Sequence, residues 1–297
     1  MTRVAFYLFI KPLSLLPLPV LYVITWPFYL IVAYVIQYRK AVITQQLRDS
    51  FPEKSTQEIR QLRRKFYRHF VDTLIEVLRE FSMSDEELQR RFRLTNPEIL
   101  QPFYEAGKNV AMVMGHQGNW EYVAGIHHQM AHQFVCLYKP LKNPFIEKKV
   151  LETRRKNGCS VISIFDVGKF VKGDHPEPYM LIFIADQEPS RKSRIYWTDF
   201  LNHETAVAAG TERYAKMLDM PVFFGKILKP KRGHYEMTLE LLEAHPKQAE
   251  DGKITIEHTA ALEQNILENP AYWLWSHMRW KKKSKAELEA QKAAAGK

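Results

Sequence analysis

The sequence predicts an α/β protein: a single domain with a mostly buried mixed β-sheet flanked by helices, preceded by an N-terminal hydrophobic segment that anchors it to a membrane. Three observations predict this arrangement. A long stretch near the N-terminus, residues 12–38, is uncharged, short apolar runs alternate with helix-like stretches, and 46% of the 297 residues are hydrophobic. A chain of this length and apolar content can bury a substantial core. The composition excludes a small disulfide scaffold and argues against wholesale disorder. We divide the chain into residues 1–45, 46–281 and 282–297, the last a basic, alanine-rich tail.

The N-terminal segment runs from Pro12 to Tyr38 through 27 residues without a charge. A helix needs about 20 apolar residues to cross a bilayer core, so the segment is long enough. A cleaved signal peptide fits poorly because the apolar stretch is too long and basic residues follow it directly. A straight helix is complicated by four prolines, each of which removes a backbone donor: Pro12, Pro17, Pro19 and Pro27. A kinked span and a re-entrant or interfacial hairpin both remain open, and either is favoured over a buried helix pair.

The formal charge of +10 is concentrated at the two ends of the chain. Residues 1–68 hold eleven basic and three acidic side chains, and residues 279–297 hold seven and two. Basic residues after the apolar segment outnumber those before it, which places the rest of the chain on the cytoplasmic side. We expect the cluster Arg60–Arg68 to lie against anionic lipid headgroups, the alternative being a solvated helix face. The near-neutral middle of the chain argues against a nucleic-acid partner.

Beyond the anchor, the periodicity of apolar residues predicts the elements in order. Residues 55–81 form a long amphipathic helix, with Ser55 and Glu58 placed for a capping box. Apolar runs then predict the largely buried strands of an α/β sheet, at 110–114, 133–138, 160–165, 180–184 and 221–225. The alternating run at 234–242 predicts an edge strand.

The strongest chemical signal follows the strand at 110–114, where the sequence reads GHQGNWE over residues 115–121. A strand that ends in a tight turn before a helix is where α/β proteins expose reactive groups. With His116 on the turn and Glu121 in the first helical turn, we expect the carboxylate to hydrogen-bond the imidazole Nδ1. Such a bond fixes the tautomer and raises the basicity of the ring, which makes His116 a general base. The alternative is that His116 caps the turn and Glu121 pairs with a lysine.

Other reactive-group patterns are weak. Gly158-Cys159-Ser160 lacks the second glycine of a nucleophile elbow, and the chain contains neither a P-loop nor GxGxxG, which argues against nucleotide chemistry. Cys136 and Cys159 are interpreted as reduced packing residues rather than a disulfide.

Three clustered histidines lack a neighbouring HExxH-type ligand, so we assign them surface or packing roles and predict no metal: His127, His128 and His132.

A set of ordered motifs resembles one family over essentially the whole chain. GHQGNWE looks like the HxxxxE/D motif of the glycerolipid and lysophospholipid acyltransferase superfamily, in the form found in late acyltransferases of lipid A biosynthesis in Gram-negative bacteria. Further matches are Tyr138-Lys139-Pro140 with Asn143, Arg154 with Gly158, Asp186-Gln187, Thr211 with Pro221-Val222, and Trp275 to Lys281. The sequence departs from the pattern at Met278, where arginine is common, and in the strongly basic run 190–194.

The resemblance implies an O-acyltransferase that moves a fatty acyl chain from an acyl-carrier-protein thioester, in preference to coenzyme A, to a hydroxyl of a lipid A precursor. It implies His116 and Glu121 as the catalytic pair, no covalent acyl-enzyme, no metal and no cofactor. Arg154 is the first candidate for binding the oxyanion, with Asn119 and the backbone near Gly118 as alternatives. Asp186 is expected to bind substrate, the alternatives being that it pairs with the neighbourhood of His116 or caps the next turn. Three residues are expected to support the site: Gln187, His277 and Arg279.

The same resemblance places residues 46–281 at the cytoplasmic side of the inner membrane as an acyltransferase catalytic domain. Two alternatives remain open. The acceptor could be another lipid, such as a lysophospholipid or an aminolipid. Alternatively, the chain could be a membrane-bound lipid-binding protein that keeps the fold without catalysis.

Overall fold

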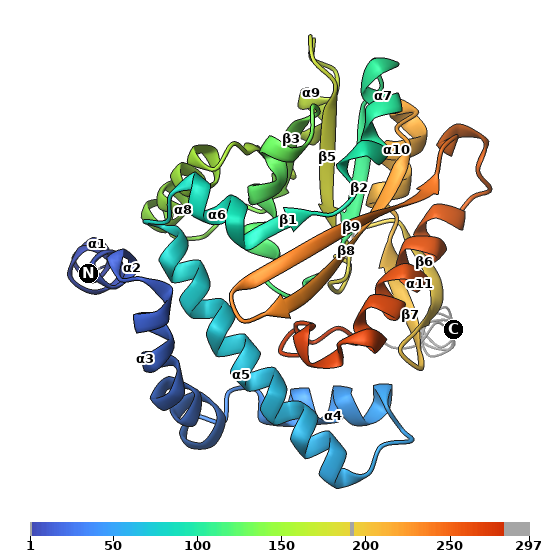
Figure 1. Ribbon diagram of the computed structural model, residues 1–297. Helices are drawn as coiled ribbons and strands as arrows, with labels where there is room; N and C mark the ends of the chain where they lie inside the picture. Colours follow the sequence, from blue (N-terminus) through green and yellow to red (C-terminus); the bar gives the residue numbers. More distant parts are fainter. Residues whose placement is uncertain (1, 191–192, 282–297) are drawn as a thin grey trace, which may run out of the picture.

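A mixed β-sheet lies at the centre of the computed structural model, which describes residues 2–190 and 193–281 (Figure 1). Its seven strands follow the order β1-β9-β8-β2-β5-β3-β4. Neighbouring strands are parallel except for the β8–β9 hairpin. The strands are β1 (Phe92–Leu94), β2 (Val110–Met114), β3 (Gln133–Tyr138), β4 (Ser160–Ser163), β5 (Tyr179–Ile184), β8 (Val222–Lys231) and β9 (His234–Glu243). A separate antiparallel pair is formed by β6 (Ile195–Phe200) and β7 (His203–Ala208).

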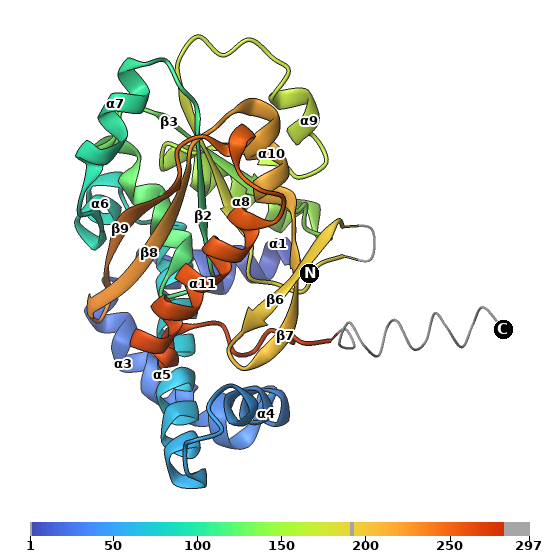
Figure 2. The same ribbon diagram turned by 90° about the vertical axis from the view of Figure 1, so that its right-hand side faces the viewer.

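The helices cover both faces of this sheet (Figure 2). Those that follow the N-terminal region are α4 (Lys40–Ser50), α5 (Thr56–Glu80), α6 (Asp85–Arg91), η3 (Pro97–Leu100), α7 (Gln101–Glu105), η4 (Trp120–Gln129), α8 (Pro144–Lys156), α9 (Val167–Phe170), α10 (Gly210–Leu218), η5 (Pro246–Gln248), α11 (Lys253–Glu268) and η6 (Pro270–Tyr272). Alternate residues of β2 point to opposite faces. Val113 belongs to the core packed under α5, α10 and α11, whereas Met112 belongs to the core under α6 and η4.

The predicted α/β class with a mixed sheet is confirmed, as are the capping box of α5 and the strand positions. The edge-strand prediction for residues 234–242 is wrong. β9 lies between β8 and β1, and β1 covers its open edge by pairing Phe92 with Tyr235. A strand of three residues is too short to show a periodic pattern, which is why the sequence does not reveal β1.

The N-terminal region comprises α1 (Thr2–Ala5), η1 (Phe6–Ile10), α2 (Lys11–Leu15), α3 (Leu18–Leu30) and η2 (Ile31–Val35). The stretch Leu18–Val35 is long and apolar enough to cross a membrane. One side of α3 nevertheless packs on α5, where Leu21 is buried and the Tyr22 hydroxyl donates to Glu76 Oε1 at 2.7 Å. The opposite side leaves Val23 and Trp26 exposed.

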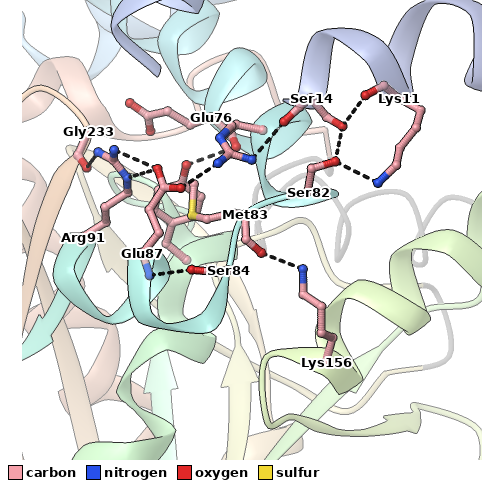
Figure 3. A network of polar contacts seen from close by, with 12 residues as sticks. Lys11, Ser14, Glu76, Ser82, Met83, Ser84, Glu87, Arg91, Lys156 and Gly233 are labelled. Carbon is pink, nitrogen blue, oxygen red and sulfur yellow. Dashed lines mark hydrogen bonds and ion pairs between the residues drawn. The ribbon is translucent and has the colours of Figure 1, made fainter. Parts of the chain in front are cut away.

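Polar contacts also hold α2 to the corner between α5 and α6 (Figure 3). Lys11 Nζ donates to Ser82 Oγ at 2.9 Å, the hydroxyls of Ser14 and Ser82 lie 2.6 Å apart, and Arg79 donates to the Ser14 carbonyl at 2.9 Å. The segment is therefore docked on the rest of the chain by specific bonds. The proposed division at residue 45 falls inside α4, and the tail 282–297 lies outside the described residues.

The two cysteines are free thiols whose Sγ atoms lie 3.3 Å apart. Cys136 belongs to β3, and Cys159 directly precedes the neighbouring strand β4. Cys159 is buried and Cys136 is half-buried. Because 23 positions separate the two cysteines, no local sequence pattern indicates that they lie close together.

Candidate active site

The turn after β2 is held in place by the last residue of η6 and by the segment that follows this helix. The N–H of Gly118 donates to the Tyr272 carbonyl at 2.9 Å, and the N–H of Leu274 donates to the His116 carbonyl at 3.1 Å. Gly118 has a φ of +61°, in the left-handed region that glycine adopts at little cost. The tryptophan-rich end of the chain therefore helps to build this turn.

Gly115 allows a carboxylate to approach the backbone of the turn. A Cβ atom there would lie 2.5 Å from Leu262 Cδ1 and 3.3 Å from Asp186 Oδ2. Real side chains do not approach that closely. The space left by the glycine lets Asp186 Oδ2 accept the backbone N–H of His116 at 2.8 Å.

The partner of the His116 ring is Asp186, which corrects the expected bond from Glu121. His116 Nδ1 lies 2.6 Å from Asp186 Oδ1, and the indole N–H of Trp273 donates to the other carboxylate oxygen at 2.7 Å. Asp186 follows β5, the parallel neighbour of β2, and Met114 pairs with Ile184 at the ends of the two strands. The two residues therefore meet at the carboxyl edge of the sheet, where α/β proteins place their sites.

Burial and charge act in opposite directions on this pair. Burial by itself lowers the pKa of His116, but the Asp186 carboxylate, its hydrogen bond and the charge of Glu121 raise that pKa above its ordinary value. Burial likewise works to raise the pKa of Asp186, whereas the His116 ring and the bonds that the carboxylate accepts lower it to about 2. Asp186 is therefore ionised at neutral pH, which favours the tautomer of His116 that carries its proton on Nδ1.

Glu121 forms an ion pair with Arg154 instead of bonding His116. Its Oε2 accepts from Arg154 Nη2 at 2.6 Å, and both side chains are largely buried. Arg154 comes from the last turn of α8, so the pair joins η4 to α8. A guanidinium carries five N–H donors, and the bond to Glu121 engages only part of this set.

The two alternative oxyanion donors already have hydrogen-bond partners within the chain. Asn119 is fully buried and donates its side-chain amide to Glu76 Oε2 at 2.9 Å, while the N–H of Gly118 is bonded to Tyr272. Both therefore stabilise the turn, and Arg154 remains the candidate for contacting a developing negative charge.

The expected support residues lie around Asp186. The Gln187 amide nitrogen is 3.3 Å from His116 Nε2, the ring nitrogen that faces away from Asp186. His277 Nε2 accepts the backbone N–H of Glu188 at 3.1 Å. Arg279 is 2% exposed and donates to the Ala206 carbonyl at 2.8 Å, so it links the segment after Trp275 to β7 inside the protein.

A cavity of about 540 Å³ opens at His116. Its polar lining includes Glu121, Arg154 and Gln187. Most of the remaining wall is apolar, and its apolar residues are Val77, Phe81, Trp120, Leu137, Leu141, Val150, Leu151, Ile164, Phe183 and Ile184. The volume lies within the usual range for small-molecule sites, and an apolar wall with a few convergent polar groups is typical of them.

The sequence analysis missed Glu80, a buried carboxyl group in the cavity wall. Burial raises the pKa of Glu80 to about 8 and the charge of Glu121 adds to the effect, although Arg154 and Lys156 oppose it. Glu80 Oε1 accepts from Asn157 Nδ2 at 3.1 Å, which ties the end of α5 to the end of α8. A usable signal was present in the sequence, because Asp72, Glu76 and Glu80 recur every four residues on one buried side of α5.

The histidine cluster separates in the structure. His132 is buried and its Nε2 bonds the Lys108 carbonyl at 3.1 Å. Asp85 joins His127 and His128 instead, and one potential ligand atom from each of the three lies within 4.8 Å of the others. These three residues, which could hold a metal ion, lie outside the lining of the cavity.

Comparisons with known proteins identify the family. The crystal structure of the 1-acyl-sn-glycerophosphate (LPA) acyltransferase PlsC from Thermotoga maritima matches with a TM-score of 0.36 and 11% identity, covering 86% of this chain and 96% of that chain. A search of curated proteins finds no match. The family model described as bacterial lipid A biosynthesis acyltransferase matches residues 2–282. The chain therefore belongs to the bacterial lipid A biosynthesis acyltransferases, enzymes that transfer an acyl group to a lipid.

Proposed function

We propose that the protein transfers a fatty acyl chain from an acyl-carrier-protein thioester to a hydroxyl of a lipid A precursor, with His116 as general base oriented by Asp186. The observation that carries this proposal is the 2.6 Å contact between Asp186 Oδ1 and Nδ1 of His116, a residue that lines a mostly apolar cavity. A ring whose Nδ1 proton is held by a carboxylate presents Nε2 as a proton acceptor.

The reaction needs a base because an alcohol is too weakly acidic to attack at neutral pH. As the acceptor oxygen bonds to the thioester carbonyl carbon, its proton passes to His116 Nε2, in place of the contact with Gln187. The tetrahedral intermediate then breaks its carbon–sulfur bond, and the leaving thiolate takes the proton from the imidazolium. This sequence requires no covalent acyl-enzyme. In support, the Cys159 thiol is buried, and its hydrogen bond to Cys136 together with burial raises its pKa.

We assign Glu121 a role through Arg154. The ion pair aims the guanidinium into the cavity that His116 also lines. A fixed cation near the carbonyl oxygen stabilises the negative charge that develops there. Glu121 also favours the imidazolium electrostatically, since its charge raises the pKa of His116. The original expectation of a His/Glu pair is thereby replaced by two linked pairs, His116–Asp186 and Glu121–Arg154.

The cavity suits an acyl chain because most of its lining is aliphatic or aromatic. An acyl carrier protein is acidic, and electrostatic attraction to basic surfaces would speed its encounter with this chain. Exposed basic residues on α5 supply one such surface: Arg60, Arg64, Lys65 and Arg68.

We place the protein at the inner membrane, with residues 46–281 on the cytoplasmic side. The bonds from Tyr22 to Glu76 and from Arg232 to Thr25 (2.6 Å) favour an interfacial N-terminal segment over a freely spanning helix. Exposed apolar side chains on the other side of α3, such as Val23 and Trp26, would then enter the lipid.

The test is acyl transfer by the purified, detergent-solubilised protein from acyl-carrier-protein thioesters to a lipid A precursor. His116→Ala should abolish the transfer. His128→Ala, an exposed histidine outside the cavity lining, is the matched control and should keep the wild-type rate. A His116→Ala protein with the wild-type rate would disprove the general-base assignment.

The acceptor is tested separately by mass spectrometry of lipids from cells that lack the protein. An underacylated lipid A supports the proposed acceptor. An unchanged lipid A beside an altered phospholipid or aminolipid would replace it with that lipid, and no change in any lipid would favour a binding protein without catalysis.

A further inference from the structure

Another hollow, of about 670 Å³, lies between α4 and the beginning of α5. It shares no lining residue with the cavity at His116. Along α5, the 14 positions from Arg63 in this hollow to Val77 in the cavity correspond to about 21 Å of helix. We call it the basic groove, and its lining residues are Gln37, Arg39, Lys40, Ala41, Val42, Thr44, Gln45, Arg48 and Arg63.

The basic groove gathers four cationic side chains and no acidic one: Arg39, Lys40, Arg48 and Arg63. Within the described part of the chain, none of the four takes part in an ion pair. Like charges gathered in a concave surface repel one another and focus a positive potential outward. An arrangement of this kind is relieved by a bound anion.

Neutral groups orient three of these cations without cancelling their charge. Arg39 Nη1 donates to the Ser276 carbonyl at 2.7 Å, and Arg63 Nη1 donates to Thr44 Oγ1 at 2.6 Å. Lys40 Nζ donates to Gln37 Oε1 at 3.0 Å. Because these partners are neutral, the groove keeps its full positive charge while the side chains are already held in place.

The backbone at the rim of the groove is strained. Gln37 has a φ of +51° and Arg39 a φ of +49°, values that are unfavourable for residues other than glycine. Such strain persists only where surrounding contacts enforce it, and it is concentrated at functional sites. Here Tyr67 enforces it in part, since its hydroxyl donates to the Tyr38 carbonyl at 2.8 Å between the two strained residues.

The groove begins where the uncharged N-terminal segment ends. Val35 and Ile36 are 75% and 62% exposed, and the cations Arg39 and Lys40 follow within five positions. In a segment attached to a membrane, apolar residues enter the hydrocarbon and the basic residues next to them lie at the depth of the headgroups. The groove is therefore at the level where lipid phosphates are found.

We propose that the basic groove binds the phosphate headgroup of an anionic membrane lipid, at a site separate from the acyl-transfer cavity. The inference rests on the membrane attachment in the proposed function. Arginine and lysine are the side chains that recognise phosphate, by bidentate hydrogen bonds and by charge respectively. Through Arg39 and the Ser276 carbonyl, an occupied groove would also be connected to the segment that carries His277 and Arg279.

The test is an isothermal titration calorimetry experiment in which short-chain phosphatidic acid is titrated into the detergent-solubilised full chain. We expect saturable one-to-one binding. The double variant Lys40→Gln/Arg48→Gln should weaken it about 25-fold, from roughly fivefold for each cation removed. The matched control Lys172→Gln/Arg213→Gln removes the same two residue types from exposed positions outside both the groove and the cluster Arg60–Arg68, and it should bind as the wild type does.

Three results would overturn the proposal: no saturable binding, equal weakening by the two double variants, or binding of inorganic phosphate as tight as that of the lipid. The last outcome would assign the groove to free phosphate. Thermal unfolding of each variant, measured by circular dichroism, separates lost binding from lost folding. Binding of the wild type to neutral phosphatidylcholine vesicles tests the membrane attachment by itself, so its failure is distinguishable from that of the groove.

Discussion

Asp186→Asn is the substitution that tests the architecture of the site most directly. The carboxylate accepts three hydrogen bonds, from His116 N–H, His116 Nδ1 and the Trp273 indole. An asparagine of the same shape has a single acceptor oxygen. If that oxygen takes the place of Oδ2, which accepts two of the three bonds, the amide N–H₂ group faces Nδ1. His116 must then accept at Nδ1 and carry its proton on Nε2, the wrong tautomer for a base.

The expected magnitude follows from this change of tautomer. An asparagine at the aspartate of a serine-hydrolase triad produces the same fault and lowers kcat about 10⁴-fold. We expect a loss of about 10³- to 10⁴-fold here, equivalent to about 4–5.5 kcal/mol at about 1.36 kcal/mol for each factor of ten. A hydrogen bond to a charged group contributes roughly 1.5–3 kcal/mol. Asp186→Asn removes one such bond, the bond from Nδ1 of the ring, and replaces the charged acceptor of the other two bonds by a neutral one, so a total loss of this size is consistent with that value.

The pH dependence of the rate is a second, independent test of the His116–Asp186 pair. The proposed reaction uses neutral His116, and the pKa of this ring is raised by Asp186 against the effect of burial. The wild-type rate should therefore fall as the pH drops through a value above 6.5, the ordinary pKa of histidine. Without the carboxylate, the effect of burial on the pKa of His116 outweighs the remaining effect of the Glu121 charge, so the neutral ring is favoured. The acid limb of the residual activity in Asp186→Asn should therefore move to lower pH.

The assay is the steady-state rate of acyl transfer from acyl-carrier protein, measured across the pH range for the wild type and two variants. Glu121→Gln is the informative comparison, because it removes the partner of Arg154 and leaves the Nδ1 bond to Asp186 in place. Its acid limb should move less than that of Asp186→Asn. If Asp186→Asn kept the wild-type profile and a rate within tenfold, while Glu121→Gln lost both, Glu121 would be the true partner of the ring.

Three further predictions concern the cavity wall and its surroundings. The pKa of Glu80 is about 8 in the folded protein, above its unfolded value, so the contribution of the protonated carboxyl group to the free energy of unfolding is complete at acid pH and is lost as the pH rises towards 8. Urea unfolding at pH 5 and pH 9 should therefore show that the free energy of unfolding of Glu80→Gln, relative to that of the wild type, is roughly 3–5 kcal/mol higher at pH 9 than at pH 5. Leu151→Trp should fill part of the cavity and shift the preferred thioester to shorter chains, as read from kcat/KM across an acyl series. Gly158→Ala should destabilise the fold by about 1–3 kcal/mol in thermal unfolding, since its φ is +79° and the new Cβ would lie 2.1 Å from the His127 ring.

Local sequence patterns predict those parts of the structure that depend on interactions between residues close together in the chain. The all-buried strand β2 follows from its five apolar residues, and α5 begins where Ser55 and Glu58 form the capping box. The position of His116 at the end of a buried strand was equally readable. Contacts between segments that are distant in the sequence could not be predicted in this way, because the partner of a side chain depends on which strands become neighbours in the sheet.

The pairing of His116 with Asp186 illustrates this limit. Both residues follow apolar strands, but only the strand order shows that β2 and β5 are adjacent and parallel. Sequence proximity favoured Glu121 instead, five positions from the histidine. The buried carboxyl of Glu80 was missed for a related reason, because an acidic residue on an amphipathic helix is usually solvated.

The spacing between His116 and Glu121 is explained without a hydrogen bond between them. Trp120 begins η4 and packs edge-on against the His116 ring, with the ring centroids 4.9 Å apart. The next residue, Glu121, is then directed to Arg154 on α8. Each carboxylate thus has its own partner, imidazole for Asp186 and guanidinium for Glu121, so the proposed base and the proposed oxyanion-binding group are each oriented by a separate carboxylate while lining one cavity. A His/Glu pair alone would orient the base and leave Arg154 without the partner that directs it.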